Sequence, residues 1–105
     1  MFIGDKWTVP VIMTIHQGGV VRFSVIQRIL GDISSKLLAS TLKKLEREGF
    51  IRRDATPTVP VSVEYQLTEL GRSFEVEVLR PMGAWARRSS DAIESSRDSF
   101  DMPIK

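Results

Sequence analysis

The clearest helical signal in this sequence lies in residues 34–49: Ser-Ser-Lys-Leu-Leu-Ala-Ser-Thr-Leu-Lys-Lys-Leu-Glu-Arg-Glu-Gly. Ser34 or Ser35 can cap a helix that continues to Glu48, and Gly49 can end it. A buried stripe is predicted along one side, because its leucines return at steps of four and three residues: Leu38, Leu42 and Leu45. Another side is predicted to be basic and hydroxylated by the same spacing: Lys36, Ser40, Lys43 and Arg47.

Two helices are predicted before this segment. The first spans about Asp5 to Gln17 and is followed by a Gly-Gly pair that ends it; Asp5 can cap it. Pro10 would then lie beyond the first turn and should kink the helix. The second helix runs from Arg22 or Phe23 to Ile29, and its predicted buried face consists of Phe23, Ile26, Ile29 and Leu30.

A β-hairpin and a long helix are predicted after it. Phe50 to Asp54 and Ser62 to Leu67 read as strands joined by a proline-stiffened tip, and Tyr65 is expected in the core. Thr68 can cap the last helix. A bend is predicted in that helix at Pro81 and Gly83. An apolar stripe is predicted along it: Leu70, Phe74, Val78, Met82 and Trp85 or Ala86. From Phe74 to Trp85 this stripe exceeds what a small core needs, so we expect it to pair with a second copy of the chain, although a helix packed within one chain would explain the same residues.

Length and composition limit the class of protein. The chain has 105 residues, 42% of them apolar and 27% charged, which fits one globular domain. We expect that domain over residues 1–88 and a polar tail over 89–105 that is a frayed helix or disordered. Cysteine is absent, which excludes disulfides and thiolate chemistry, and His16 alone is a poor metal site. The chain has no phosphate-binding glycine loop and no nucleophile elbow, so we expect no enzyme, no metal and no cofactor.

Charge is distributed unevenly along the chain. Residues 34–53 contain six basic and two acidic side chains, whereas residues 89–105 contain four acidic and two basic ones. A basic middle suits an anionic polymer, although a solvated helix face would explain the same residues. The start of the chain does not resemble a leader peptide, and the longest nearly apolar run, Val9–Ile15, is too short to cross a bilayer. We therefore expect a cytoplasmic protein with no membrane partner.

The order of elements is helix, helix, basic helix, hairpin, helix, a mainly α fold with a small β-hairpin (α+β). This is the layout of a winged helix-turn-helix, in which the third helix can lie in the DNA major groove. The sequence resembles the HxlR-type winged-helix regulators, which are related to the wider MarR group. Four stretches carry the resemblance: Gly4–Trp7, Arg22-Phe23, Ile33–Gly49 and Val59–Gly71.

The resemblance implies a homodimeric transcriptional regulator that binds specific sequences in double-stranded DNA. The recognition helix would be about Ser34–Glu48, and the wing, about Ala55–Val61, would reach the flanking backbone or minor groove. The predicted DNA contacts are Ser35, Lys36, Ser40, Lys43, Arg22, Arg52, Arg53 and Thr58. Arg52 and Arg53 should point to opposite faces of their strand, so both cannot touch the same groove wall. The predicted dimer contacts, through the terminal helices, are Trp7, Phe74, Val78, Met82 and Trp85.

Two questions stay open at this level. Many HxlR-type proteins sense oxidants through a cysteine in a preceding helix; these 105 residues contain no cysteine, so we expect no thiol-based sensing. An effector would instead be a small apolar molecule between the core and the terminal helices. The alternative function is a winged helix that binds protein without strong DNA binding, which the uncharged wing at Val61-Ser62 and the acidic tail favour.

Overall fold

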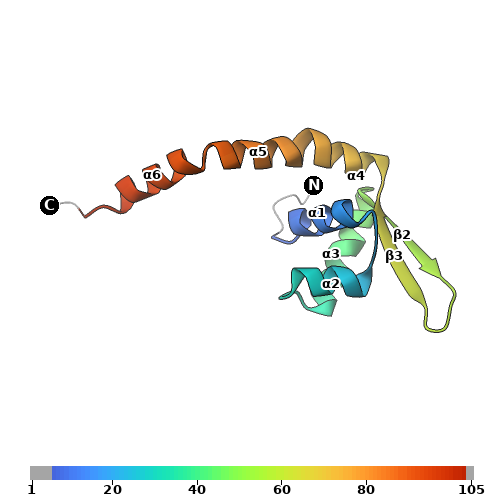
Figure 1. Ribbon diagram of the computed structural model, residues 1–105. Coiled ribbons are helices and arrows are strands. Elements are labelled where there is room, and N and C mark those ends of the chain that lie inside the picture. Colours follow the sequence, from blue (N-terminus) through green and yellow to red (C-terminus); the bar gives the residue numbers. More distant parts are fainter. Residues whose placement is uncertain (1–5, 104–105) are drawn as a thin grey trace.

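The computed structural model of the chain describes residues 6–103 and shows a three-helix body, a small sheet and a long C-terminal arm (Figure 1). The molecule is elongated, with extents of 67 × 28 × 23 Å, because the arm projects away from the body. We call residues 69–101 the terminal arm. The elements are α1 (Thr8–Gly18), β1 (Val20–Arg22), α2 (Phe23–Leu30), α3 (Ser35–Arg47), β2 (Ile51–Thr56), β3 (Ser62–Leu67), α4 (Glu69–Phe74), a π-helical segment η1 (Glu75–Leu79), α5 (Arg80–Arg88) and α6 (Ser90–Asp101).

Helix α3 forms as its sequence predicts. The Ser34 hydroxyl caps it by accepting a 3.1 Å hydrogen bond from the backbone N–H of Leu37. At the other end Gly49 takes a positive φ of 85°, a conformation that side chains with a Cβ rarely adopt. The predicted leucine stripe is buried and packs in the core with α1 and the sheet. One side of α3 is therefore fixed inside the domain, and the other side faces outward.

Two details predicted for the first helices are wrong. Helix α1 begins at Thr8, so Pro10 lies in its first turn, where a missing N–H breaks no hydrogen bond and causes no kink. The predicted cap, Asp5, lies outside the described residues. Ile29 was expected to be buried in α2, yet it is 61% exposed. Ile26 is the only fully buried residue of α2. The helical period places Leu30 to one side of Ile26 and Ile29 to the other side, which faces solvent.

The sheet has one more strand than the predicted hairpin. Strands β2 and β3 pair antiparallel from Ile51 opposite Leu67 to Thr56 opposite Ser62. A short strand, β1, pairs antiparallel with the free side of β3, which gives the order β1-β3-β2. Tyr65 in the central strand is buried, as predicted. Strand β1 thereby ties the start of α2 to the base of the hairpin.

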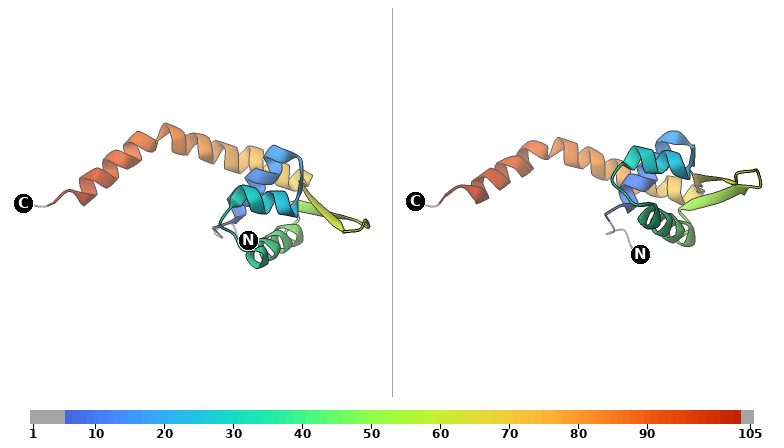
Figure 2. Two further views of the ribbon diagram at one scale, coloured as in Figure 1. Left: turned by 60° about the horizontal axis from the view of Figure 1, so that its bottom comes forward. Right: turned by 90° about the horizontal axis from the view of Figure 1, so that it is seen from below.

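The terminal arm starts at a capped turn and continues as helix for most of its length. Thr68 caps α4 by accepting a 3.1 Å hydrogen bond from the N–H of Gly71. Helix α5 runs without a break through Pro81 and Gly83, the positions of the predicted bend. The wider turns of η1 end at Leu79, two residues before Pro81, and accommodate its missing N–H. The helix instead breaks at Ser89, between α5 and α6 (Figures 1 and 2).

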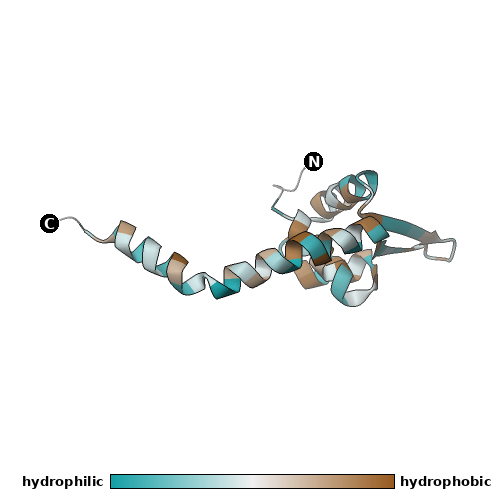
Figure 3. Ribbon diagram, turned by 90° about the horizontal axis from the view of Figure 1, so that it is seen from above, coloured by the Kyte–Doolittle hydropathy of each residue, from teal (hydrophilic) through white to brown (hydrophobic). Residues whose placement is uncertain are grey.

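Only the first part of the terminal arm packs against the body. Phe74 is buried and stacks on Phe50 with ring centroids 5.1 Å apart, and Leu79 is also buried. No residue of α5 or α6 is buried, although Met82 and Trp85 are large and apolar. Figure 3 shows apolar and polar residues alternating along this unsupported part of the arm. Within residues 6–103, no helix combines the length and the apolar character needed to span a membrane.

Candidate nucleic-acid interface

The outward face of α3 is basic and uncovered. Lys36, Ser40 and Lys43 are all exposed, while Leu38 and Leu42 behind them are fully buried. The spacing of the sequence explains the division, because each set recurs on its own side of the helix. Figure 2 shows α3 at the surface of the three-helix body, beside the hairpin. The predicted α3 residues thus share one accessible surface.

Two shallow hollows extend this surface toward the hairpin. The first, about 410 Å³, lies between α3 and the sheet; two basic side chains, Lys43 and Arg53, and one acidic side chain, Glu46, line it with Ala39 and Tyr65. The second, about 640 Å³, lies between the start of α2 and the hairpin tip and is lined by Arg22, Arg53 and Thr58, among others. Arg53 borders both hollows. We call Lys43, Arg53 and Arg22 the basic strip, and it runs from α3 to the β2–β3 hairpin.

Arg52 lies apart from this strip. Its Nε is 3.2 Å from Oδ2 of Asp54 on the same strand, and the Gln66 amide donates to that same oxygen at 3.2 Å. These hydrogen bonds, from Gln66 first and Arg52 second, lower the pKa of Asp54. Neighbouring residues of a strand point to opposite faces, so Arg53 lines the hollows while Arg52 pairs with Asp54. Only one of the two predicted strand arginines therefore joins the basic strip.

The wing tip is uncharged. Residues 57–61 are Pro-Thr-Val-Pro-Val, and Val59 at the end is fully exposed. The Thr58 hydroxyl donates its proton to the carbonyl of Pro60 at 2.7 Å, so its oxygen can only accept another hydrogen bond. The peptide bond between Val59 and Pro60 is cis. The tip can therefore offer van der Waals contact to DNA but no positive charge.

The residues predicted for the dimer contact are divided between the core and the surface. Val78, Met82 and Trp85 are each about half exposed on the terminal arm, at 45%, 51% and 55%. Phe74 lies inside its own domain, stacked on Phe50. Trp7 is half-buried just before α1, with Nζ of Lys6 5.4 Å from the centre of one of its rings.

Residues 2–94 match the sequence profile described as HxlR-like helix-turn-helix. The chain belongs to the HxlR-like helix-turn-helix family. It is similar to YtfH of Escherichia coli, named an HTH-type transcriptional regulator, with 34% identity over 91% of this chain and 75% of that protein. YybR of Bacillus subtilis carries the same designation and is 38% identical over 92% of this chain and 76% of its own.

A solved relative confirms the winged helix-turn-helix fold of this HxlR-like chain. The reduced form of the transcriptional regulator YodB from Bacillus subtilis superposes with a TM-score of 0.71 and 33% identity, covering 98% of this chain and 88% of that one. In this HxlR-like fold the second and third helices form the helix-turn-helix and the β2–β3 hairpin forms the wing. The resemblance inferred from the four sequence stretches is therefore confirmed.

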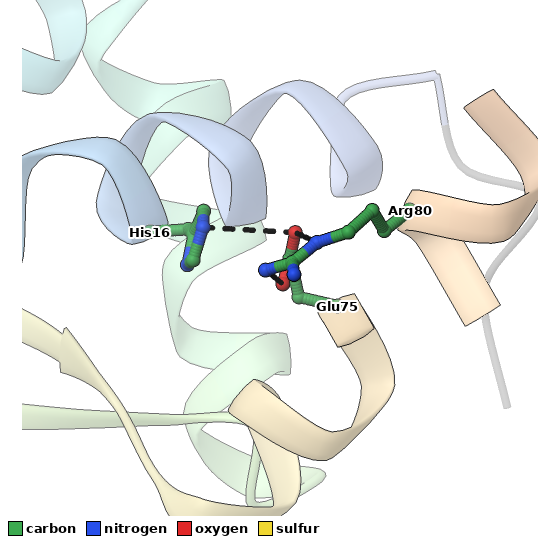
Figure 4. A network of polar contacts seen from close by, with 3 residues as sticks. All are labelled: His16, Glu75 and Arg80. Carbon is green, nitrogen blue, oxygen red and sulfur yellow. Dashed lines mark hydrogen bonds and ion pairs between the residues drawn. The ribbon is translucent and has the colours of Figure 1, made fainter. Parts of the chain in front are cut away.

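Two sets of polar contacts, one beside α3 and one at the terminal arm, had no signal in the sequence. Gln27 of α2 donates to the Ser35 hydroxyl at the start of α3 at 2.8 Å. Glu75 of η1 is buried, accepts hydrogen bonds from Arg80 at 3.1 and 2.8 Å, and lies 3.6 Å from Nε2 of His16 in α1 (Figure 4). The bonds to Glu75 raise the pKa of Arg80. Through His16 the second cluster joins the terminal arm to the body. The His16–Glu75 and Gln27–Ser35 contacts each link separate elements, so no spacing along one helix reveals them.

Proposed function

We propose that this chain is a homodimeric transcriptional regulator that binds specific sequences of duplex DNA through α3 in the cytoplasm. Its family and its named relatives are helix-turn-helix transcriptional regulators, a role that involves no catalysis. The observation that carries the proposal is the exposed Lys36–Ser40–Lys43 face, set directly opposite a fully buried leucine stripe. Such a helix can enter a major groove without giving up any of its packing in the core.

Each part of the surface suits a different part of the duplex. Lys36 and Lys43 would contact phosphates, and the short hydroxyl side chains of Ser35 and Ser40 would reach base edges. The rest of the basic strip, Arg53 and Arg22, would follow the backbone toward the wing. Because Arg52 pairs with Asp54 on the other face, we assign it no phosphate. The uncharged wing tip would lie against the backbone or in the minor groove.

The homodimer would form through the terminal arm. Met82 and Trp85 expose apolar surface on α5, and no residue of this helix is buried against its own domain. Pairing this surface across a two-fold axis would remove it from water and hold two α3 helices about 34–36 Å apart, one turn of duplex DNA. The target would then be a two-fold symmetric sequence.

We assign a small apolar effector to an apolar hollow beside the terminal arm. The hollow measures about 300 Å³, lies between the start of β2 and the terminal arm, and is lined mainly by Phe50, Leu70, Phe74 and Val78. A small apolar ligand there would touch both the body and the arm, and could therefore change the angle between them. A Leu70→Trp change should occupy the hollow and abolish any thermal stabilisation that such ligands produce.

A fluorescence-anisotropy titration tests the proposal. Labelled duplexes selected by the chain from a random-sequence pool should bind more tightly than a scrambled duplex of equal composition, and binding should weaken as salt is added. The alternative function, a protein-binding winged helix, predicts no enrichment in the selection and no binding to either duplex even at low salt. That second result would overturn DNA recognition.

A further inference from the structure

The side-chain amide of Gln27 bridges α2, the intervening turn and the start of α3. Nε2 of Gln27 lies 2.8 Å from Oγ of Ser35, the first residue of α3, and 3.4 Å from the backbone oxygen of Ile33 in the intervening turn. Gln27 is half-buried, whereas Ser35 is exposed on the surface that we assign to DNA. The Gln27 amide therefore contacts Ser35 from the protein side of that surface.

The partners of this amide fix the direction of its hydrogen bonds. A backbone carbonyl oxygen only accepts, so the end of the amide that faces Ile33 is the NH₂ group. The same NH₂ group faces Ser35, and the hydroxyl oxygen of Ser35 is therefore the acceptor. A serine hydroxyl has a single proton, and here that proton is not used toward Gln27. Among the described residues Ser35 has no further hydrogen-bond partner, so this proton is available to a ligand at the N-terminal end of α3.

We propose that Gln27 is a positioning residue for DNA recognition, which holds the Ser35 hydroxyl as a hydrogen-bond donor toward an acceptor atom of the duplex. The inference rests on the proposed function, because it needs Ser35 to face DNA. Acceptors of the required kind are the N7 and O6 atoms of guanine, N7 of adenine, O4 of thymine and the phosphate oxygens. Gln27 itself touches no DNA; it determines which atom of Ser35 is presented and where.

A double-mutant cycle tests this assignment. Gln27→Met keeps the length of the side chain but removes both hydrogen bonds, and Ser35→Ala removes the hydroxyl. Gln27→Met should weaken binding of the intact chain to its selected duplex by about threefold to tenfold, the effect of one hydrogen bond. In the Ser35→Ala background the same change should have almost no effect, because the hydroxyl that it orients is gone. Thermal melting of each variant without DNA separates this effect from a loss of folding.

The two kinds of acceptor are distinguished by the control duplex. A loss confined to the selected sequence assigns the proton of Ser35 to a base edge, whereas an equal loss on the scrambled duplex assigns it to a phosphate; both support the inference. An equal loss from Gln27→Met with and without the Ser35 hydroxyl would overturn it, and so would no loss at all. If the unaltered chain binds neither duplex, the proposed function itself fails, which is a different result.

Discussion

Replacing Gly71 by a residue with a Cβ should weaken the packing of the terminal arm against the body. A Cβ at this position would lie 2.0 Å from the backbone oxygen of Phe50 and 3.0 Å from its carbonyl carbon. That carbonyl cannot easily turn away, because it accepts a hydrogen bond from the N–H of Thr68 at 3.1 Å. Alanine would gain about 1 kcal/mol in helix propensity over glycine. Separating α4 from β2 should cost more than that gain, so we expect Gly71→Ala to lower the free energy of unfolding by about 2 kcal/mol net.

Gly83→Ala is the matched control, because it makes the same chemical change in the same arm. A Cβ at residue 83 would meet only the flexible end of Arg87, at 3.4 Å. We therefore expect this variant to gain up to about 1 kcal/mol. Urea unfolding followed by circular dichroism, at one fixed chain concentration, measures both. If Gly71→Ala is as stable as Gly83→Ala, the close contact between α4 and the backbone of Phe50 is refuted.

Three further predictions concern charge and assembly. Gln66→Leu should raise the pKa of Asp54, which NMR titration of the Asp54 carboxyl group measures. A lowered folded-state pKa stabilises the fold above the unfolded-state pKa, and this stabilisation disappears as the pH falls through the folded-state pKa. The stability difference between Gln66→Leu and the unaltered chain should therefore shrink over the same fall in pH. Glu75→Gln should lower the free energy of unfolding by about 1 kcal/mol, since the buried carboxylate loses charge-assisted hydrogen bonds; an unchanged urea midpoint would show that the cluster contributes nothing. Met82→Glu with Trp85→Glu should halve the mass found by sedimentation equilibrium, and a chain that is already a monomer before substitution would exclude the proposed dimer.

Local signals predicted the central part of this fold well. The cap at Ser34, the leucine spacing of α3 and the left-handed Gly49 all act within one helix, so the sequence contains the whole cause. The alternation along Ser62–Leu67 likewise predicted β3 with its observed bounds. Strand β1 was missed because three residues are too few to show a period, and its pairing partner lies more than forty positions away along the chain.

The candidate site was predicted less completely for the same reason. The basic face of α3 could be read from one helix, and it is exposed as expected. Whether Arg52 or Arg53 joins that face depends on how the sheet packs on α3, which no local pattern contains. The contact between Gln27 and Ser35 depends on the angle between two helices. Contacts of this kind require the tertiary structure.

The salt dependence of DNA binding counts the phosphates that the protein neutralises, and it therefore shows whether the lysines of α3 lie on the duplex. Lys36→Ala with Lys43→Ala should weaken binding and reduce the slope of log affinity against log salt by about two per bound protomer. Arg88→Ala with Arg97→Ala removes the same charge from exposed positions on the terminal arm and should leave the slope unchanged. An unchanged slope in the lysine variant, or an equal reduction in the arginine variant, would contradict the assignment of α3 to the duplex.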